Sequence, residues 1–534
     1  MRFSEHLFGA FALTTVIALS AASGCGKTNN STFGEMIGDN SDASPSGGED
    51  GASDALDLFP PPSSSGGINL GDTGAPAPAC DAAVGWGCKV DTTCSSPTTL
   101  TGKVFDPAGK NPLYDVVVFI PDDATKLPAI TQGTHTCNTC DDPIGNYVVA
   151  TTTAYDGSFT LTGVPTANGV PVTVQIGKWR RTIGVNITNN CGTNTVSATP
   201  TSTPLLRLPT KQSEGDMPQM ALLTGGCDDM ACFLMNLGIS STEFTAPQGG
   251  GRIDVYQGQG LGGLAGPSLS NGTAGACTTT TCPLWSSKAS FEAYDIALFS
   301  CQCSEGTNEN AAAYTNLRDW LNEGGKVFAS HYHYTWFEDN PSADFKGVAN
   351  WGNTGNNDLA TSNGQTYDID DTFPKSVTFG RWLGVVGALN GTAAPPTTMS
   401  ATPPASMTLG YVADSVRTVN APTSRWIYDP ATAAGEGGTA NDVKYLSFDT
   451  PIGGAPPPPD AGPESGPFYC GKAVYTDLHT GGSLLATAAS VPADCKAADL
   501  SAQQKALEFL FFDLAACVTD DTKPPPPPPP NPPQ

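Results

Sequence analysis

The sequence predicts two folded segments of different class, an antiparallel β-sandwich over residues 95–208 and an α/β domain with a parallel sheet over residues 215–520. Three observations predict this division. Residues 95–208 hold short runs rich in Thr and Val, separated by turn residues, which is typical of a sandwich. After residue 218, apolar strand-like runs alternate with helical segments, which is typical of a parallel sheet covered on both faces. Residues 25–94 and 521–534 lack the apolar side chains that a core needs.

The first 24 residues have the pattern of a bacterial export signal. One arginine precedes an apolar run from Leu7 to Leu19, and small residues then lead to Cys25. The stretch "ASGC" is similar to a lipobox in which Ala22 takes the place of the usual leucine. We therefore expect lipid on Cys25 to anchor the mature chain at the cell envelope, on the outer or cytoplasmic membrane. The alternative is cleavage near Ala22 and secretion.

Composition predicts how the two ends of the chain behave and which partners are excluded. Residues 25–94, rich in Ser, Gly, Pro and Asp, are expected to form a disordered tether, and residues 521–534 an extended polyproline tail. The chain has 25 Lys and Arg against 51 Asp and Glu, a net charge of -26. Because phosphate binding needs clustered basic side chains, this charge excludes nucleic acid as a partner.

Sixteen cysteines in an exported chain predict disulfides, because the compartment outside the cytoplasm is oxidising. If Cys25 carries lipid, fifteen remain, so at least one is left over from intrachain pairing. The sequence leaves the connectivity open. The close pairs that can form short loops are Cys137/Cys140, Cys227/Cys232 and Cys277/Cys282.

Three stretches of residues 95–208 carry a family resemblance. "LTGKVFDPAGKNPLYDVVVFIP", "TTTAYDGSFTLTGVP" and "VPVTVQIGKWRR" resemble the carboxypeptidase regulatory-like domain, a transthyretin-like sandwich. Such modules accompany enzymes and surface proteins and carry no catalytic groups themselves, so the resemblance implies a fold and no activity. Trp179 and the two arginines after it either form a binding edge or pack at a strand end.

A second resemblance covers the α/β segment. The order "YDIALFSC", "LRDWLNEGGKVFASH" and "GKAVYTDLH" resembles the class I glutamine amidotransferase-like superfamily, and within it the ThuA-like branch. This implies a flavodoxin-like α/β fold over residues 215–520, with a loop-rich insertion at 338–442. A working amidotransferase needs its nucleophile on a Gly-x-Cys-x-Gly turn, and "FSCQCSE" lacks those glycines, so glutaminase activity is expected to be lost. The whole arrangement also resembles surface lipoproteins common in myxobacteria.

The candidate site follows from where the reactive side chains stand. In open α/β sheets, ligands bind at the carboxyl ends of the strands. His331 and His479 each come at the end of a predicted strand, so we expect them to meet if those strands are parallel neighbours. The full candidate set is His331, His333, His479, Asp477 and Cys301.

Two chemical hypotheses use these residues. On an extended backbone His331 and His333 lie on the same side, and His479 adds the third nitrogen that zinc or a similar ion favours, with Asp477 or water completing the site. The alternative is that one histidine bonds a strand end while neighbouring aromatic rings pack the loop. Cys301 or Cys303 with a histidine base could instead be a nucleophile, although an exported thiol readily forms a disulfide.

A third hypothesis is a surface-binding module without catalysis. The sandwich and residues 338–442 would bind a polysaccharide, an envelope component or a protein. The aromatic residues suited to stacking on sugars are Trp351, Tyr367, Trp382, Tyr411 and Trp426. Surface binding is the main functional prediction, and a hydrolase with a metal- or histidine-based site is its alternative.

Overall fold

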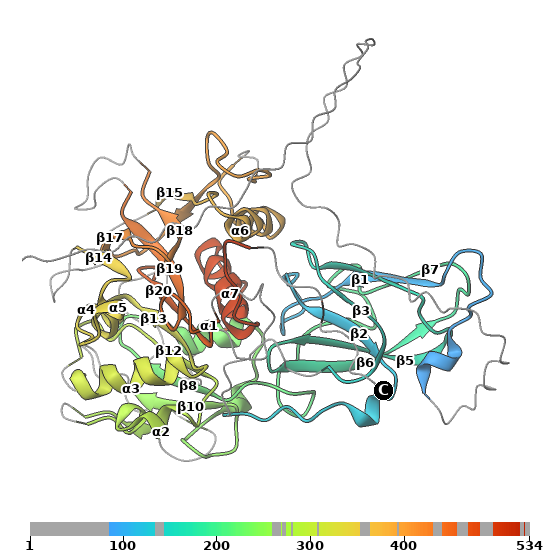
Figure 1. The fold of residues 1–534 in the computed structure, drawn as a ribbon, viewed down its shortest axis with the longest axis horizontal. Coiled ribbons are helices and arrows are strands. Elements are labelled where there is room, and N and C mark those ends of the chain that lie inside the picture. Colours follow the sequence, from blue (N-terminus) through green and yellow to red (C-terminus); the bar gives the residue numbers. More distant parts are fainter. Residues whose placement is uncertain are drawn as a thin grey trace, which may run out of the picture. The chain divides into compact units, whose positions relative to one another are not determined.

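The structure is a computed structural model that describes residues 85–133, 144–258, 269, 274–278, 281–306, 309–352, 364–391, 395–430, 441–456, 468–480, 495–523 and 528. The predicted export signal, Cys25, Cys137 and Cys140 lie outside the described residues. The described chain is mostly β-sheet with a few helices (Figure 1). Among its helices, none is both long and apolar enough to cross a membrane.

The first seven strands form two sheets. One is antiparallel, in the order β3-β2-β5-β6, and the other has the order β4-β1-β7. Because β1 pairs antiparallel with β4 but parallel with β7, this region is not the purely antiparallel structure that the sequence predicts. The bounds are β1 Thr99–Lys103, β2 Val117–Pro121, β3 Tyr147–Thr152, β4 Ser158–Thr162, β5 Ala167–Ile176, β6 Trp179–Ile187 and β7 Thr193–Val196.

The third sheet is mixed, and its parallel half contains the candidate site. The order is β11-β10-β8-β12-β13-β20-β19-β18-β15-β16. The neighbouring strands β10, β8, β12, β13 and β20 run parallel, whereas β19 pairs antiparallel with β20. The predicted parallel sheet is therefore only one half of this mixed sheet. The bounds are β8 Met220–Thr224, β9 Phe244–Thr245, β10 Ile253–Gln257, β11 Gly275–Ala276, β12 Ile296–Phe299, β13 Lys326–Ser330, β19 Val443–Thr450 and β20 Gly471–Thr476.

The segment 338–442, predicted to be rich in loops, supplies regular elements in its described part. Strands β15, β16 and β18 extend the large sheet beyond β19, and β14 and β17 pair with each other beside it. All five strands pair antiparallel, and the Thr-, Asn- and Gly-rich sequence does not signal them strongly. The bounds are β14 Ala349–Trp351, β15 Gln365–Ile369, β16 Ser406–Leu409, β17 Val416–Val419 and β18 Ser424–Tyr428.

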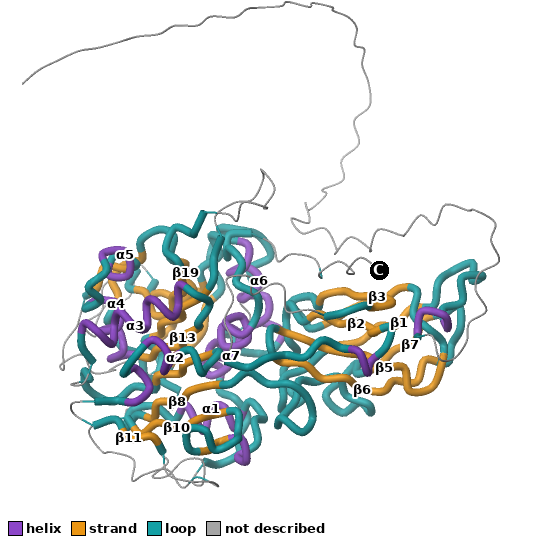
Figure 2. Tube along the Cα trace, turned by 60° about the horizontal axis from the view of Figure 1, so that its bottom comes forward, coloured by secondary structure: helices purple, strands orange, loops and turns teal. Residues whose placement is uncertain are grey.

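Both faces of the parallel half are buried under helices (Figure 2). On β8, Met220 and Leu222 belong to the apolar cluster that includes α1 and α7, while Ala221 and Leu223 belong to the cluster that includes α3. A capping box of Ser501 and Gln504 begins α7. The bounds are α1 Met230–Asn236, α2 Lys288–Phe291, α3 Ala311–Asn322, α4 Thr335–Glu338, α5 Ala343–Lys346, α6 Pro374–Val385 and α7 Ala502–Ala515.

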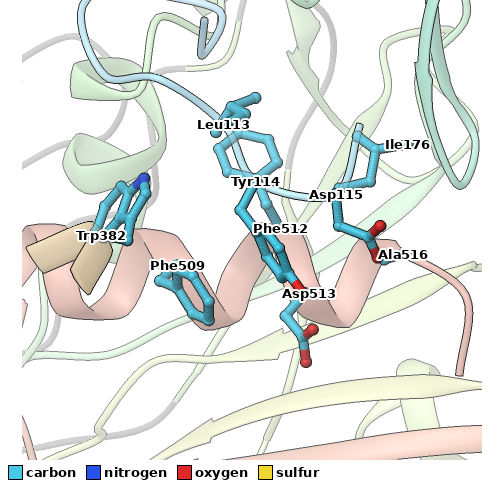
Figure 3. Close-up of a pocket in the computed structure, with 9 residues that line it drawn as sticks. All are labelled: Leu113, Tyr114, Asp115, Ile176, Trp382, Phe509, Phe512, Asp513 and Ala516. Carbon is cyan, nitrogen blue, oxygen red and sulfur yellow. The ribbon is translucent and has the colours of Figure 1, made fainter. Parts of the chain in front are cut away.

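Residues from the first seven strands and from α7 share one apolar cluster. The ring of Tyr114 stacks on Phe509 with centroids 6.0 Å apart, and the indole N–H of Trp382 donates to the Pro112 carbonyl at 2.6 Å. Figure 3 shows Tyr114 and Asp115 facing the α7 side chains Phe509, Phe512 and Asp513. Because this packing is continuous, the division into separate domains at residues 208–215 stays a prediction.

Some residues that the sequence assigns to the tether and to the tail make contacts with the folded part of the chain. Trp86 N–H donates to the Asp122 carbonyl at 2.8 Å, and Cys94 forms a disulfide with Cys191, so residues 85–94 belong to the fold and not to the tether. At the other end, Asp521 is buried and accepts from the ammonium group of Lys472 at 2.7 Å. A buried charge needs such a partner, which composition alone does not disclose.

Candidate metal centre

Three neighbouring parallel strands end in side chains that can bind a metal. Strand β13 lies between β12 and β20. Cys301 follows β12, His331 directly follows β13, and His479 follows β20. Because the three strands run in the same direction, their carboxyl ends bring these side chains to one edge of the sheet.

The three potential ligand atoms face one another. His331 Nδ1 lies 3.1 Å from His479 Nε2 and 3.4 Å from Cys301 Sγ, and all three atoms lie within 4.8 Å of one another. In a tetrahedral zinc site with bonds of about 2.1 Å to nitrogen and about 2.3 Å to sulfur, ligand nitrogens are about 3.4 Å apart and sulfur is about 3.6 Å from nitrogen. The two distances from His331 Nδ1 are within a few tenths of an ångström of these values. The exposed fractions of Cys301, His331 and His479 are 0%, 1% and 1%.

A turn of backbone aims His331 at this cluster. His331 has a φ of 42°, in the left-handed region that few residues other than glycine adopt, and residues His331–Tyr334 form a 3-10 turn. The hydroxyl of Tyr475 donates to the His331 carbonyl at 2.9 Å, and the Tyr332 ring stacks on the imidazole with centroids 4.0 Å apart. Residues held in such sparsely populated conformations are often found at functional sites.

The same turn removes His333 from the site, so its prediction as a ligand beside His331 on an extended backbone is wrong. His333 Nε2 donates to the Ser300 carbonyl at 2.9 Å, and its Nδ1 accepts from the Trp336 indole at 3.2 Å. Its ring also packs against Phe299, with centroids 5.2 Å apart. Both ring nitrogens are thus engaged in holding the strand end, which was the alternative that the sequence left open.

Asp477 stands beside the cluster without being a ligand. Its carboxylate accepts from the Tyr475 hydroxyl at 2.6 Å and from the Ser415 amide at 2.9 Å. Since the same Tyr475 hydroxyl also contacts the His331 carbonyl, Asp477 helps to position His331 through Tyr475.

Asp228 is a further residue at this edge of the sheet, outside the set that the sequence predicts. Helix α1 begins at Met230 with Asp229 as its N-cap, and the Asp228 carboxylate points into the site. It accepts from the Thr480 amide at 2.7 Å and the Cys301 amide at 3.2 Å, and also from the Ser330 hydroxyl. Its position just after β8, at the same sheet edge as the other groups, is the signal that could have found it.

The hydrogen bond on the far side of His479 sets its tautomer. Its Nδ1 lies 2.9 Å from the Cys227 carbonyl, which can only accept, so Nδ1 carries the proton. Asp228 Oδ1 is 3.5 Å from the same nitrogen. His479 Nε2 therefore presents a lone pair to His331 and Cys301, as metal-bound histidines do when their other nitrogen donates to a carbonyl or carboxylate.

The sulfur of Cys301 is in an unusual environment. Burial raises the pKa of its thiol well above the ordinary range, the negative charge of Asp228 raises it further, and hydrogen bonds from the Cys303 and Tyr332 amides act in the opposite direction. If the His331 Nδ1 proton is donated to His479, the Cys301 S–H has no acceptor among the described residues. Those two amides are donors, so they suit a metal-bound thiolate better than a thiol.

The disulfides around the site differ from the close pairs that spacing suggested. Of the short loops that the spacing allows, Cys277/Cys282 forms, whereas Cys227 pairs with Cys303 and Cys232 pairs with Cys495. The Cys227/Cys232 loop does not form because the two side chains have different partners, 76 and 263 residues away. Cys303 is therefore not a free nucleophile, and Cys301 is a reduced cysteine between oxidised neighbours.

Two other groups with metal-binding atoms have simpler explanations. Asp414 and Asp429 both pair with the buried ammonium of Lys444, and nearby Asp442 pairs with Arg417, so cationic side chains already balance this acidic group. The second group comprises Asp91, Cys94 and Cys191, in which the two cysteines form a disulfide.

The residues proposed for surface binding are largely inside the protein. Tyr367, Trp382 and Trp426 are buried, so they cannot stack on a sugar, and Trp351 packs against Phe337 with centroids 6.3 Å apart. The possible binding edge at Trp179 is also occupied by packing, because this indole is fully buried. The two arginines after it pair with carboxylates: Arg180 with Asp216, and Arg181 with Glu214.

Comparison with known proteins adds no family. No family model matches the chain, and no curated protein matches it. Among solved structures, the chain is similar to one described as "mmIFT52 N-terminal domain", with 8% identity and a TM-score of 0.27, covering 56% of this chain and 97% of that one. A likeness at this level carries no argument about fold or activity.

Proposed function

We propose that this chain is an exported, lipid-anchored envelope protein that holds one transition-metal ion between Cys301, His331 and His479. The observation that carries the proposal is the convergence of one sulfur and two nitrogens at spacings of 3.4 and 3.1 Å. A thiolate with two imidazoles suits zinc or copper, whereas magnesium and calcium prefer oxygen ligands.

Charge balance supports the same site. A divalent ion would offset the negative charges of the Cys301 thiolate and of the buried Asp228 carboxylate, which lowers the cost of burying them. Without an ion, the His331 Nδ1 proton is donated to His479 Nε2. The Cys301 thiol then faces a nitrogen that already donates elsewhere and does not accept from it.

The envelope location rests on the sequence signal and on the four disulfides formed by described cysteines, which fit an oxidising compartment. Within the sequence resemblance to a regulatory-like sandwich and a ThuA-like α/β domain, the site occupies the edge where the fold places ligands. Glutaminase activity through Cys301 is disfavoured, since burial holds the pKa of its thiol high.

A hydrolase is the second candidate function, and one observation favours it. Three protein ligands leave one position of a tetrahedral ion open, as in zinc enzymes that bind water or substrate there. Neither the cavity lined by Tyr114 nor the one lined by Arg252 reaches the cluster, so a catalytic role requires an access path that these cavities do not supply.

Elemental analysis of the purified chain, prepared under oxidising conditions without a histidine tag, tests the proposal. We expect about one zinc or copper ion per chain, lost in Cys301→Ser and His479→Ala. Cobalt substitution adds a second readout, since sulfur-to-cobalt charge transfer absorbs only if Cys301 is bound. His333→Gln is the matched control, because it removes a buried histidine and keeps a donor for the Ser300 carbonyl.

Three results would contradict the metal site. A folded chain that binds no metal after dialysis against zinc and copper would exclude it. Metal retained in the Cys301→Ser/His479→Ala double variant would place the ion elsewhere. Metal lost equally in His333→Gln, with unchanged near-ultraviolet circular dichroism, would restore the ligand set that the sequence first suggested.

A further inference from the structure

A second polar cavity lies on β10, away from the metal ligands. Its volume is about 590 Å³, in the range of small-molecule sites. The lining comes from the β9–β10 loop, from β10 and from the α2 region. Its polar lining residues are Gln219, Gln248, Arg252, Asp254, Tyr256, Ser290 and Tyr294.

The floor of this cavity is a hydrogen-bonded chain of buried groups. The Tyr294 hydroxyl donates to Asp254 Oδ2 at 2.9 Å and lies 2.8 Å from the Tyr256 hydroxyl. The Gln248 amide also donates to Asp254 Oδ2 at 3.1 Å. Asp254, Tyr256 and Tyr294 are at most 5% exposed, so the floor consists of buried polar groups that hydrogen-bond to one another.

Two groups on this surface have unused hydrogen-bonding capacity. Arg252 Nε is buried without a hydrogen-bond partner, and no described carboxylate forms an ion pair with its guanidinium. Asp254 Oδ1 has only the Thr245 hydroxyl, at the limiting distance of 3.5 Å. Arg252 and Asp254 line the same cavity and yet form no ion pair with each other. The cavity therefore presents a guanidinium without a carboxylate partner among the described residues and a carboxylate oxygen with one weak donor.

We propose that this cavity binds a sugar carrying a carboxylate, such as a uronic acid residue. The Arg252 guanidinium would take the ligand carboxylate, and Asp254 Oδ1 would accept from a ring hydroxyl. The remaining polar groups come from separate elements around the cavity, which suits a ligand with several hydroxyls. An amino acid would also offer a carboxylate and a donor, but it would leave most of these groups and most of the volume unused.

Isothermal titration of the full chain with D-galacturonate tests the proposal, with D-galactose and L-glutamate as comparison ligands. We expect galacturonate to bind more tightly than either. Arg252→Gln should weaken galacturonate binding about tenfold or more, because it removes a charge-assisted pair, and should leave galactose binding little changed. Arg318→Gln is the control, since that side chain pairs with Asp319 on α3.

Asp254→Asn provides a second variant that keeps the shape of the floor. It should also weaken galacturonate, because an amide accepts less strongly than a carboxylate. The proposal is overturned if galacturonate does not bind, if glutamate binds more tightly, or if Arg252→Gln has no effect. Arg252→Gln should keep the metal content of the wild-type chain, because Arg252 lies outside the metal cluster, so failure of this proposal and failure of the metal site are separately visible.

Discussion

The carboxyl group of Asp115 offers a test of how the first seven strands and α7 hold together. Burial raises the pKa of Asp115 from 3.8 to about 7, against the attraction of Lys375, and the charge of Asp513 raises it further. Asp115 lies at the cavity beside α7 that Figure 3 shows. Its φ of 58° is in the left-handed region, which asparagine also tolerates, so Asp115→Asn removes the charge without straining the backbone.

The direction of the pH effect follows from the raised pKa. Below about pH 3 this carboxyl is neutral in both states and does not affect stability. As pH rises toward 7, the unfolded chain loses the proton while the folded chain retains it, so stability falls. Above pH 7 the loss is constant. A difference of about 3 pKa units corresponds to about 4 kcal/mol at most. Because Asp115 keeps some contact with water, we expect about 1–3 kcal/mol.

Urea denaturation of both proteins at pH 3, 5 and 8, with the disulfides intact, measures this difference. We expect the smallest difference in stability at pH 3 and a more stable Asp115→Asn variant at pH 8. Asp156→Asn is a control for which the pH effect has the opposite sign. Burial raises the Asp156 pKa, but hydrogen bonds from Ser158 and Lys103 outweigh burial and lower that pKa. The stability that the Asp156 carboxylate contributes is therefore lost as pH falls. A wild-type-minus-variant difference that does not change with pH would refute the reasoning about Asp115.

Three further predictions concern the site and the core. Asp228→Asn should lower metal affinity by about tenfold to a hundredfold in a chelator competition, because it removes the charge behind His479; unchanged affinity would make Asp228 purely structural. Lys375→Met should destabilise the chain by about 3–5 kcal/mol in urea, since it leaves Asp513 and its buried neighbours short of one cation; a neutral result would mean that Lys472 suffices. Replacing Cys232 and Cys495 by alanine should cost roughly 2–5 kcal/mol, measured by thermal unfolding, because their disulfide closes a long loop.

The local pattern of the sequence was sufficient for the features that depend on neighbouring residues. The alternation of strands and helices and the capping box at Ser501 and Gln504 both follow from residues within a few positions of one another. The sequence also placed Cys301, His331 and His479 directly after strands, which made an edge of the sheet the candidate site.

Only the tertiary structure decided which of those side chains meet. His331 and His479 are 148 residues apart, and they meet because β13 and β20 pair in parallel. His333 is two residues from His331, yet a 3-10 turn sends it to the opposite side, against Ser300 and Trp336. Strand pairing and disulfide partners are choices among distant segments, and apolar periodicity, which repeats within a few residues, does not distinguish between them.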